Sequence, residues 1–292
     1  MTVPGAPLPR QVRSIFHPSD FSESSEVAFA HALKIALVAG ADLNILHVSE
    51  RGNRPWSEFP RVRQMLERWR VLPPGSPRDA VSSLGIQVKK VLARDSDPVA
   101  AALGYLEQNP TDLVVLATHQ REGRARWLTK SVGQPIARQS GLMTLFIPWG
   151  LEGFVSRGDG GVSLRNILIP VAQEPRPGAA IEAACRAAWG LQCDEVTFTV
   201  MYVGEAGDAP ALSFEQHEGW TWQRITREGD VADAIAAVAR ESAADLIVMA
   251  TEGRHGFLDA LRGSTTERVL RQAPCPLLAV PIGPRPSPPA GH

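Results

Sequence analysis

The sequence predicts two tandem α/β domains of one kind, each with a parallel sheet covered by helices on both faces. Three observations lead to this prediction: the chain length, an internal repeat, and an alternation of strand-like and helix-like segments. At 292 residues the chain is about twice as long as a common domain of roughly 150 residues. Hydrophobic residues make up 44% of the chain and charged residues 21%, which is typical of a protein with a full core.

The repeat is ungapped and shows that the chain contains two copies of one unit. Residues 112–148 align with residues 245–281 at a constant offset of 133, since 245 − 112 = 133. Self-similarity of this extent indicates a duplication rather than an effect of composition. The identical pairs include Asp112/Asp245, Thr118/Thr251, Arg121/Arg254, Gly123/Gly256, Leu128/Leu261, Ser131/Ser264, Arg138/Arg271, Gln139/Gln272 and Pro148/Pro281.

The order of elements in each half predicts a parallel sheet. The first half reads as a strand at 14–18, a helix at about 24–39 that stops at Gly40, a strand at 42–48, a strand at 86–92, a helix at 98–108, and the duplicated strand-loop-helix-strand. The second half repeats this order with segments 166–170, 179–191, 195–203, 220–227 and 231–243. Strands that alternate with helices of 10 to 15 residues form βαβ crossovers, which build a parallel sheet.

The halves differ between their second and third strands, where the first half is longer. Residues 51–85 add a helix that carries Trp56, Phe59, Met65, Leu66 and Trp69, whereas the second half has only about residues 204–218 there. We expect a first domain at 12–149, a linker at 150–163 with Gly-Asp-Gly-Gly at its centre, a second domain at 164–282, and a flexible tail at 283–292 rich in Pro and Gly.

Composition argues against several classes of function. Thirty Lys and Arg against 31 Asp and Glu leave a net charge of −1 without a dense basic block, which argues against nucleic acid as a partner. No apolar run approaches the roughly 20 residues needed to span a bilayer, so no membrane association is expected. Cys185, Cys193 and Cys275 lack paired metal spacing and are interpreted as buried thiols of a cytoplasmic protein. The seven histidines show no metal-ligand spacing and are interpreted as packed and hydrogen-bonded.

The duplicated segment of the second half contains a candidate anion-binding loop. A strand that ends at Ala250 leads into a loop with Gly253 and Gly263, and a helix is expected from about Ser264. Glycines let backbone N–H groups approach an anion, and a helix N-terminus attracts negative charge. The alternative, a loop glycine followed by a helix capped by Ser264, stays open.

The same loop carries a resemblance to a known family. The sequence reads DLIVMA, then Thr251-Glu252-Gly253, nine residues, Gly263-Ser264, and finally APCPLLAV. This resembles the Gly, two residues, Gly, nine residues, Gly-Ser/Thr pattern of the universal stress protein family. The first half is similar to the family through HPSDFSESSEVAFAHAL and LNILHV. The resemblance covers nearly all of residues 12–282.

The resemblance implies a Rossmann-like fold of the adenine nucleotide alpha hydrolase-like type. Each domain would have five parallel strands in the order 3-2-1-4-5, and the two domains would pair through their last strands as an intrachain pseudo-dimer. A homodimer of chains stays open. The family also implies ATP as ligand, with or without Mg²⁺. The implied nucleotide-binding residues are Val171, Val203, Ala250, Gly253, Arg254, Gly263, Ser264 and Thr265.

The sequence departs from the family pattern in both halves. In the second half Ala250 replaces the first motif glycine, and Ala172 stands where ATP-binding members have an acidic residue. In the first half Asp20 supplies that acid, but Lys130 and Ser131 stand in a loop that has lost its glycines. These three residues are a possible remnant of a site. Asp20 has an alternative role as a helix N-cap, with Glu23 as its capping-box partner.

Three hypotheses follow for function. The first is a cytoplasmic stress-response protein that binds ATP in its second domain and acts as a regulatory module. The second is a pseudo-dimeric scaffold that binds no nucleotide and acts through protein partners or through another small ligand near residues 51–85. The third is a slow ATP hydrolase, which is less favoured because no catalytic residue or metal site is recognised in the sequence.

Overall fold

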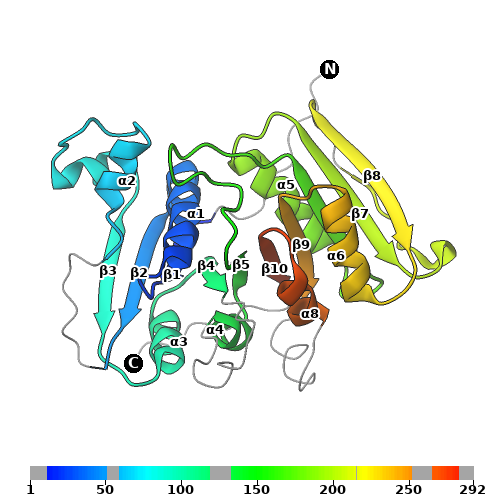
Figure 1. The fold of residues 1–292 in the computed structure, drawn as a ribbon, viewed down its shortest axis with the longest axis horizontal. Helices are drawn as coiled ribbons and strands as arrows, with labels where there is room; N and C mark the ends of the chain where they lie inside the picture. The colour runs from blue at the N-terminus through cyan, green and yellow to red at the C-terminus, as the bar shows by residue number, and fades with distance from the viewer. Residues whose placement is uncertain (1–11, 51–58, 119–132, 215, 252–264, 283–292) are drawn as a thin grey trace.

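The computed structural model describes residues 12–50, 59–118, 133–214, 216–251 and 265–282. Their strands form one ten-stranded sheet in the order β3-β2-β1-β4-β5-β10-β9-β6-β7-β8 (Figure 1). Each half contributes five strands, and in each half the order along the sheet is third, second, first, fourth, fifth. The predicted fold class and strand order are therefore confirmed.

The elements follow the predicted order within about two residues. The first half contains β1 (Ser14–Pro18), α1 (Glu23–Ala39), β2 (Asp42–Val48), α2 (Val62–Arg68), η2 (Arg78–Leu84), β3 (Val88–Ala93), α3 (Pro98–Gln108), β4 (Leu113–Thr118), α4 (Gly133–Ser140) and β5 (Met143–Pro148). The second half contains β6 (Asn166–Val171), α5 (Gly178–Gly190), β7 (Val196–Val203), η3 (Ala206–Asp208), β8 (Trp220–Arg227), α6 (Val231–Glu241), β9 (Leu246–Thr251), α8 (Thr265–Gln272) and β10 (Leu277–Pro281). The two halves differ most between their second and third strands. In the first half the described part of this segment, residues 59–85, forms the short helix α2 and the 3₁₀ helix η2, whereas the second half has only η3 there.

The sheet separates two apolar cores, because successive side chains of a strand point to opposite faces. Ile15 packs in the core that contains the buried faces of α1, α2 and α5. The next residue, Phe16, packs in the core under α3, α4, α6 and α8. Both halves thus cover the same two faces with equivalent helices, as the duplication requires.

The halves join through their last strands at the centre of the sheet (Figure 1). Strands β5 and β10 pair antiparallel, with Leu145 opposite Leu278 and Thr144 opposite Ala279. The other strand pairs are parallel. The predicted intrachain pairing is therefore confirmed, and the two halves are related as an isologous dimer would be.

The aspartates that open the duplicated segments have a structural role. Asp112 Oδ2 accepts hydrogen bonds from the backbone N–H groups of Arg13 and Ser14. Asp245 Oδ2 accepts them in the same way from Arg165 and Asn166. Each aspartate thereby fixes the start of the first strand of its half, at the edge opposite to the carboxyl ends of the strands.

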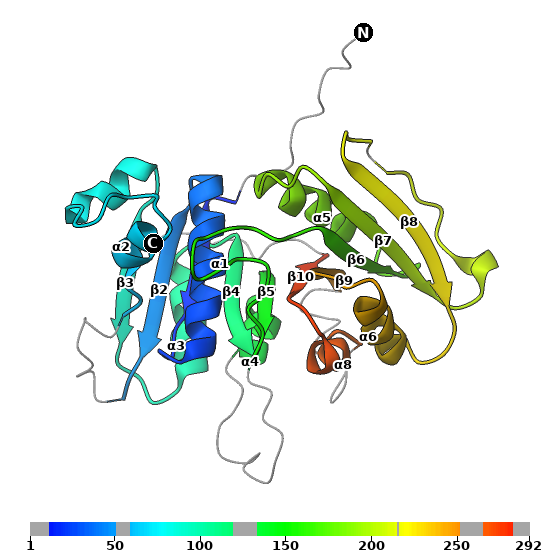
Figure 2. The same ribbon diagram turned by 45° about the horizontal axis from the view of Figure 1, so that its top comes forward.

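The predicted linker packs against the first half (Figure 2). Its residues Phe154 and Val155 are buried, and their backbone N–H groups donate to Nε2 of His31 on α1 at 3.1 and 3.2 Å. The indole N–H of Trp69 donates to the Arg157 carbonyl at 3.2 Å. We call residues 150–163 the strap. The domain boundaries at 149 and 164 stay predictions.

The strap contact defines the protonation state of His31. Its Nδ1 pairs with the Val27 carbonyl at 2.9 Å, so Nδ1 carries the proton and Nε2 accepts from the strap. Burial lowers the pKa of His31 to about 4, against weaker raising effects of the Val27 hydrogen bond and the Glu152 charge. His17 and His47 likewise bond backbone carbonyls, at Val115 and Ser19. The interpretation of these three histidines as packed and hydrogen-bonded is confirmed.

Candidate functional site

The carboxyl ends of three strands meet at one edge of the second half. Strand β6 ends at Val171 and β7 at Val203, and Val171 pairs with Tyr202, the residue before Val203. On the other side β6 pairs with β9 from Ile167 opposite Leu246, and Ala250 is the penultimate residue of β9. The structure therefore brings together three of the residues that the sequence predicted for a nucleotide site.

This edge is a topological switch point. The helix that follows β6, α5, packs in one core, and the helix that leads to β9, α6, packs in the other. Crossovers on opposite faces leave a crevice outside the carboxyl ends of the strands between them, and open α/β sheets bind ligands there. Helix α8 begins at this edge with the exposed Thr265, after β9.

The other loop residues predicted for the nucleotide site fall in a segment that the structure does not describe. Gly253, Arg254, Gly263 and Ser264 lie outside the described residues. The first-half counterparts Lys130 and Ser131 also lie outside them. The proposed phosphate contacts of this loop therefore stay predictions.

The segment after β6 has alanine at the acidic position of the family pattern, and a side-chain amide one residue later anchors it. Ala172 is exposed at the position where the family pattern has a carboxylate. The side-chain amide of Gln173 donates to the Asp208 carbonyl of η3 at 2.6 Å. This bond ties the β6–α5 connection to the segment that follows β7, so the two connections at this edge of the sheet are fixed to each other. The N-cap residue of α5, Pro177, makes no side-chain capping bond.

The proposed N-cap role of Asp20 is wrong. The N-cap of α1 is Ser22, whose Oγ accepts from the Ser25 N–H at 3.2 Å. Asp20 Oδ1 instead accepts from the N–H and the hydroxyl of Ser22 at 3.0 and 2.6 Å. Glu23 does not complete a capping box with Asp20; it pairs with Arg157 of the strap at 3.3 Å. Asp20 therefore positions the capping serine rather than capping the helix itself.

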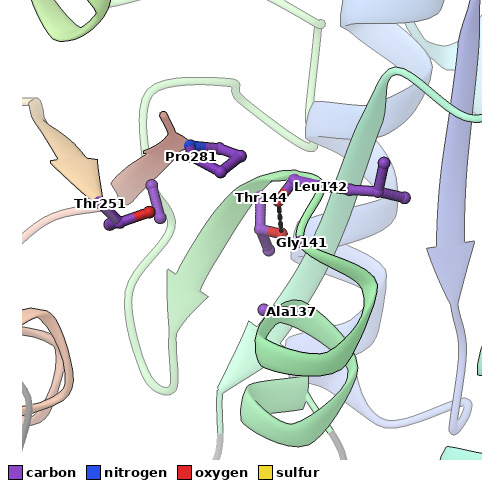
Figure 3. Close-up of a pocket in the computed structure, with 7 residues that line it drawn as sticks. Ala137, Gly141, Leu142, Thr144, Thr251 and Pro281 are labelled. Carbon is purple, nitrogen blue, oxygen red and sulfur yellow. Dashed lines mark hydrogen bonds between the residues drawn. The ribbon is translucent and has the colours of Figure 1, made fainter. Parts of the chain in front are cut away.

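A small cavity lies at the seam between the halves and is too small for a nucleotide (Figure 3). Its volume is about 10 Å³, and residues from α4, β5, β9 and β10 line it. Thr144 beside it already donates to the Leu142 carbonyl at 2.9 Å. A volume of this size holds about one water molecule, so the cavity belongs to the packing of the seam.

Thr118 at the end of β4 is the first-half equivalent of Thr251. It is 6% exposed, and its hydroxyl has no hydrogen-bond partner among the described residues, which stop at 118 and resume at 133. Thr118 thus places a buried hydroxyl at the carboxyl edge of the first half, where sequence analysis suggested only a remnant site.

Metal and thiol chemistry find no support in the described ranges. No group of three or more His, Cys, Asp or Glu side chains there could hold a metal ion. Cys185 and Cys275 are buried, and Cys193 is half-buried, so the prediction of three buried thiols is wrong for Cys193. Burial raises the pKa of Cys275 to about 12 and that of Cys193 to about 11. Both thiols are therefore protonated and unreactive near neutral pH. No described helix is long and apolar enough to cross a membrane.

The sequence matches the model of the universal stress protein family over residues 12–148 and 214–281. The chain belongs to this family. A universal stress protein of Synechocystis is 33% identical over 115 residues, 39% of this chain and 66% of the relative. A universal stress protein of Methanocaldococcus jannaschii is 47% identical over 53 residues, 18% of this chain and 31% of the relative. The matched segments thus span less than two thirds of these curated relatives.

Solved structures of the family have the same overall fold. A universal stress protein from Archaeoglobus fulgidus aligns with 93% of this chain and 97% of its own, with a TM-score of 0.61 and 18% identity. A functionally unknown protein from Pseudomonas aeruginosa aligns with 92% of each chain, with a TM-score of 0.60 and 14% identity. At these identities the likeness concerns the fold alone. Family membership, which the loop pattern predicted, is confirmed.

Proposed function

We propose that this universal stress protein is a cytoplasmic regulatory module that binds an adenine nucleotide, ATP, in its second half. The observation that supports the proposal is the convergence of Val171, Val203 and Ala250 at one switch point, with α8 beginning beside them at Thr265. The cytoplasmic location is supported by the three cysteines, which form no disulfide, since thiols are kept reduced in that compartment.

The chemistry of the proposed site is binding without turnover. Adenine would pack against Val171 and Val203, and the phosphates would lie on the backbone from Gly263 to Thr265, with Arg254 paired to them. The N-terminus of α8 favours this arrangement, because its dipole attracts negative charge. No residue here is proposed as a general base, and the exposed Ala172 supplies no ligand for Mg²⁺. Hydrolysis would therefore be slow at most.

The test is calorimetric titration of the full chain with Mg-ATP. The wild type is expected to bind near one equivalent per chain, and Gly263→Glu is expected to abolish binding by placing a carboxylate at the phosphates. Lys130→Glu is the matched control, because Lys130 occupies the repeat position equivalent to Gly263, given the offset of 133. Loss of binding in both variants, or binding that survives Gly263→Glu, would contradict the assignment to the second half.

A gain-of-function variant gives a second test of the same site. Ala172→Asp restores the acidic residue of the family pattern at an exposed position. One added hydrogen bond to a charged group is worth about 1.5–3 kcal/mol, so Mg-ATP affinity should rise about 10- to 150-fold. The rise should disappear when Mg²⁺ is replaced by a chelator if the new carboxylate acts through the metal.

The alternative is a scaffold that binds no nucleotide. Its halves already form a continuous sheet through β5 and β10, so the chain has the geometry of a dimer without a second copy. Absence of heat in the titration of the wild type and of Ala172→Asp would favour this function. The protein would then act through its surfaces or through another ligand.

A further inference from the structure

A groove of about 390 Å³ opens between α1 and α2 in the first half. Its apolar lining comprises Phe21 and Pro60, which are partly exposed, and the almost fully buried side chains of Phe29, Phe59 and Met65. A volume of this size lies within the range of about 300–1,000 Å³ that is typical of small-molecule sites. None of the lining residues belongs to the proposed nucleotide site, and α2 has no counterpart among the described elements of the second half. The groove is thus a distinct feature of the first half.

Phe21 is held in an unfavourable backbone conformation beside the groove. Its φ angle is +64°, in the left-handed region that costs a non-glycine residue about 1–2 kcal/mol. Its ring stacks on His47 at a centroid distance of 4.0 Å and meets Phe59 edge-on at 5.3 Å. Strained residues persist where the surrounding structure fixes them, and they cluster at ligand sites. The ring contacts with His47 and Phe59 hold Phe21 in this conformation, with its ring beside the groove.

The wall formed by α1 has its own counter-ion. Glu23 and Glu26 line the groove. Arg157 of the strap approaches Glu23 with Nη2 at 3.3 Å and Glu26 with Nη1 at 3.9 Å. Arg157 also pairs with Glu152 at 2.5 Å, which raises its pKa above the usual value for arginine. The acidic wall is therefore already engaged with a permanent cation.

The wall formed by α2 has no carboxylate partner within the described ranges. Arg61, Gln64 and Arg68 line the groove at intervals of three and four residues, so they share one face of the helix. Arg61 donates to the Gln64 side chain at 3.2 Å, and no carboxylate of the described residues pairs with Arg61 or Arg68. By contrast Arg63, on another face of the same helix, pairs with Glu67 at 3.5 Å. Two cations beside an apolar lining match a ligand with an apolar body and an anionic head.

We propose that this groove binds a small amphipathic monocarboxylate. Its apolar body lies on the partly exposed Phe21 and Pro60, and its carboxylate pairs with the guanidinium group of Arg61 or of Arg68. Guanidinium groups favour carboxylates because two parallel N–H donors match two oxygens. The site is independent of nucleotide binding, so either proposal can fail without the other.

Fluorescence displacement on the full chain tests the ligand class. The probe is 8-anilinonaphthalene-1-sulfonate, which combines an aromatic body with one anionic group and fluoresces in apolar sites. Decanoate should displace it, whereas decanol, with the same chain and no charge, should displace it at least about tenfold less effectively, because it cannot form the charged hydrogen bonds. Equal displacement by the two compounds, or no binding of probe and decanoate, would overturn the proposal.

Variants of α2 locate the site. The double variant Arg61→Gln/Arg68→Gln should weaken decanoate binding about tenfold or more, while Arg63→Gln should leave it unchanged. These three side chains lie on the surface of the helix, and equal melting temperatures would verify that folding is intact. Gln64→Trp should block the groove and abolish binding of both compounds. Unchanged decanoate affinity in the double variant or in Gln64→Trp would refute the site.

Discussion

Acidification should destabilise this protein through two buried histidines. Burial lowers the pKa of His17 and of His31 from 6.5 to about 4, opposed only partly by their hydrogen bonds to the Val115 and Val27 carbonyls. Both are therefore neutral in the folded state across the physiological range. In the unfolded chain each takes up a proton near pH 6.5. The stability that neutral histidine provides is complete above pH 6.5 and is lost as the pH falls toward 4.

The magnitude follows from the two pKa values of each histidine. A fall from 6.5 to about 4 corresponds to about 3 kcal/mol of unfolding free energy per histidine once the pH is below both values. At pH 5 the loss is about 2 kcal/mol per histidine, because the folded state still binds few protons there. Between pH 8 and pH 5 the two histidines together should lower the unfolding free energy by about 4 kcal/mol.

The assay is guanidinium unfolding at pH 8 and pH 5 for the wild type and for His31→Asn. The pH-independent cost of the substitution cancels within each protein, and the titration of the carboxylates cancels when the wild-type loss is compared with the variant loss. The variant should lose about 2 kcal/mol less than the wild type between the two pH values, which is the share of His31. Hydrogen exchange adds a local readout, because protonation of His31 removes the acceptor for the Phe154 and Val155 amides.

Two outcomes would refute this reasoning. If His31→Asn loses as much stability as the wild type between pH 8 and pH 5, within about 0.5 kcal/mol, His31 is not a buried neutral group. If the Phe154 and Val155 amides exchange rapidly at pH 8, the strap is not held by Nε2 of His31.

Two further predictions concern residues with positive φ. Gly153→Ala should destabilise the protein by about 1–3 kcal/mol more than Gly150→Ala, as measured by chemical unfolding. Both glycines have positive φ, but only a Cβ at position 153 would overlap the His31 ring. Equal costs of the two substitutions would contradict the contact between the strap and His31. The Phe21→Gly variant should be about 1 kcal/mol more stable than the Phe21→Ala variant. Both variants lose the aromatic ring, and only glycine adopts a φ of +64° without strain. A glycine variant less stable than the alanine variant would show that the backbone at position 21 is not strained.

The internal repeat and the order of strands and helices were sufficient to predict the fold class. Alternating strands and helices of ordinary length determine a parallel sheet, because a parallel pair needs a crossover. The pairing of β5 with β10 followed from the family resemblance, and the structure confirms it. The strands that end at Val171, Val203 and Thr251 meet at one edge because parallel strands share one direction.

Helix caps and the linker contacts were harder to predict, because neighbouring residues of similar chemistry suit the same role. Asp20 and Ser22 both suit a helix N-cap by residue type, and only the path of the chain decides that Ser22 takes this role. The strap carries the Gly and Ser residues of a linker. Its docking depends on a histidine 123 residues away along the chain, and a one-dimensional pattern does not contain such a contact.

The sequence by itself determined two α/β units of one kind, their strand order through the resemblance, and the family. It could do so because hydrophobic periodicity and turn residues determine strands and helices through residues that are close in the sequence. The duplication also presents the same pattern of elements twice. The tertiary structure alone decided which charges have partners. Arg157 pairs with Glu23 and Glu26 on the acidic wall of the groove, while Arg61 and Arg68 line the groove without a carboxylate partner among the described residues. The partner of a charged side chain depends on distance in space, which only the packing of α1, α2 and the strap sets.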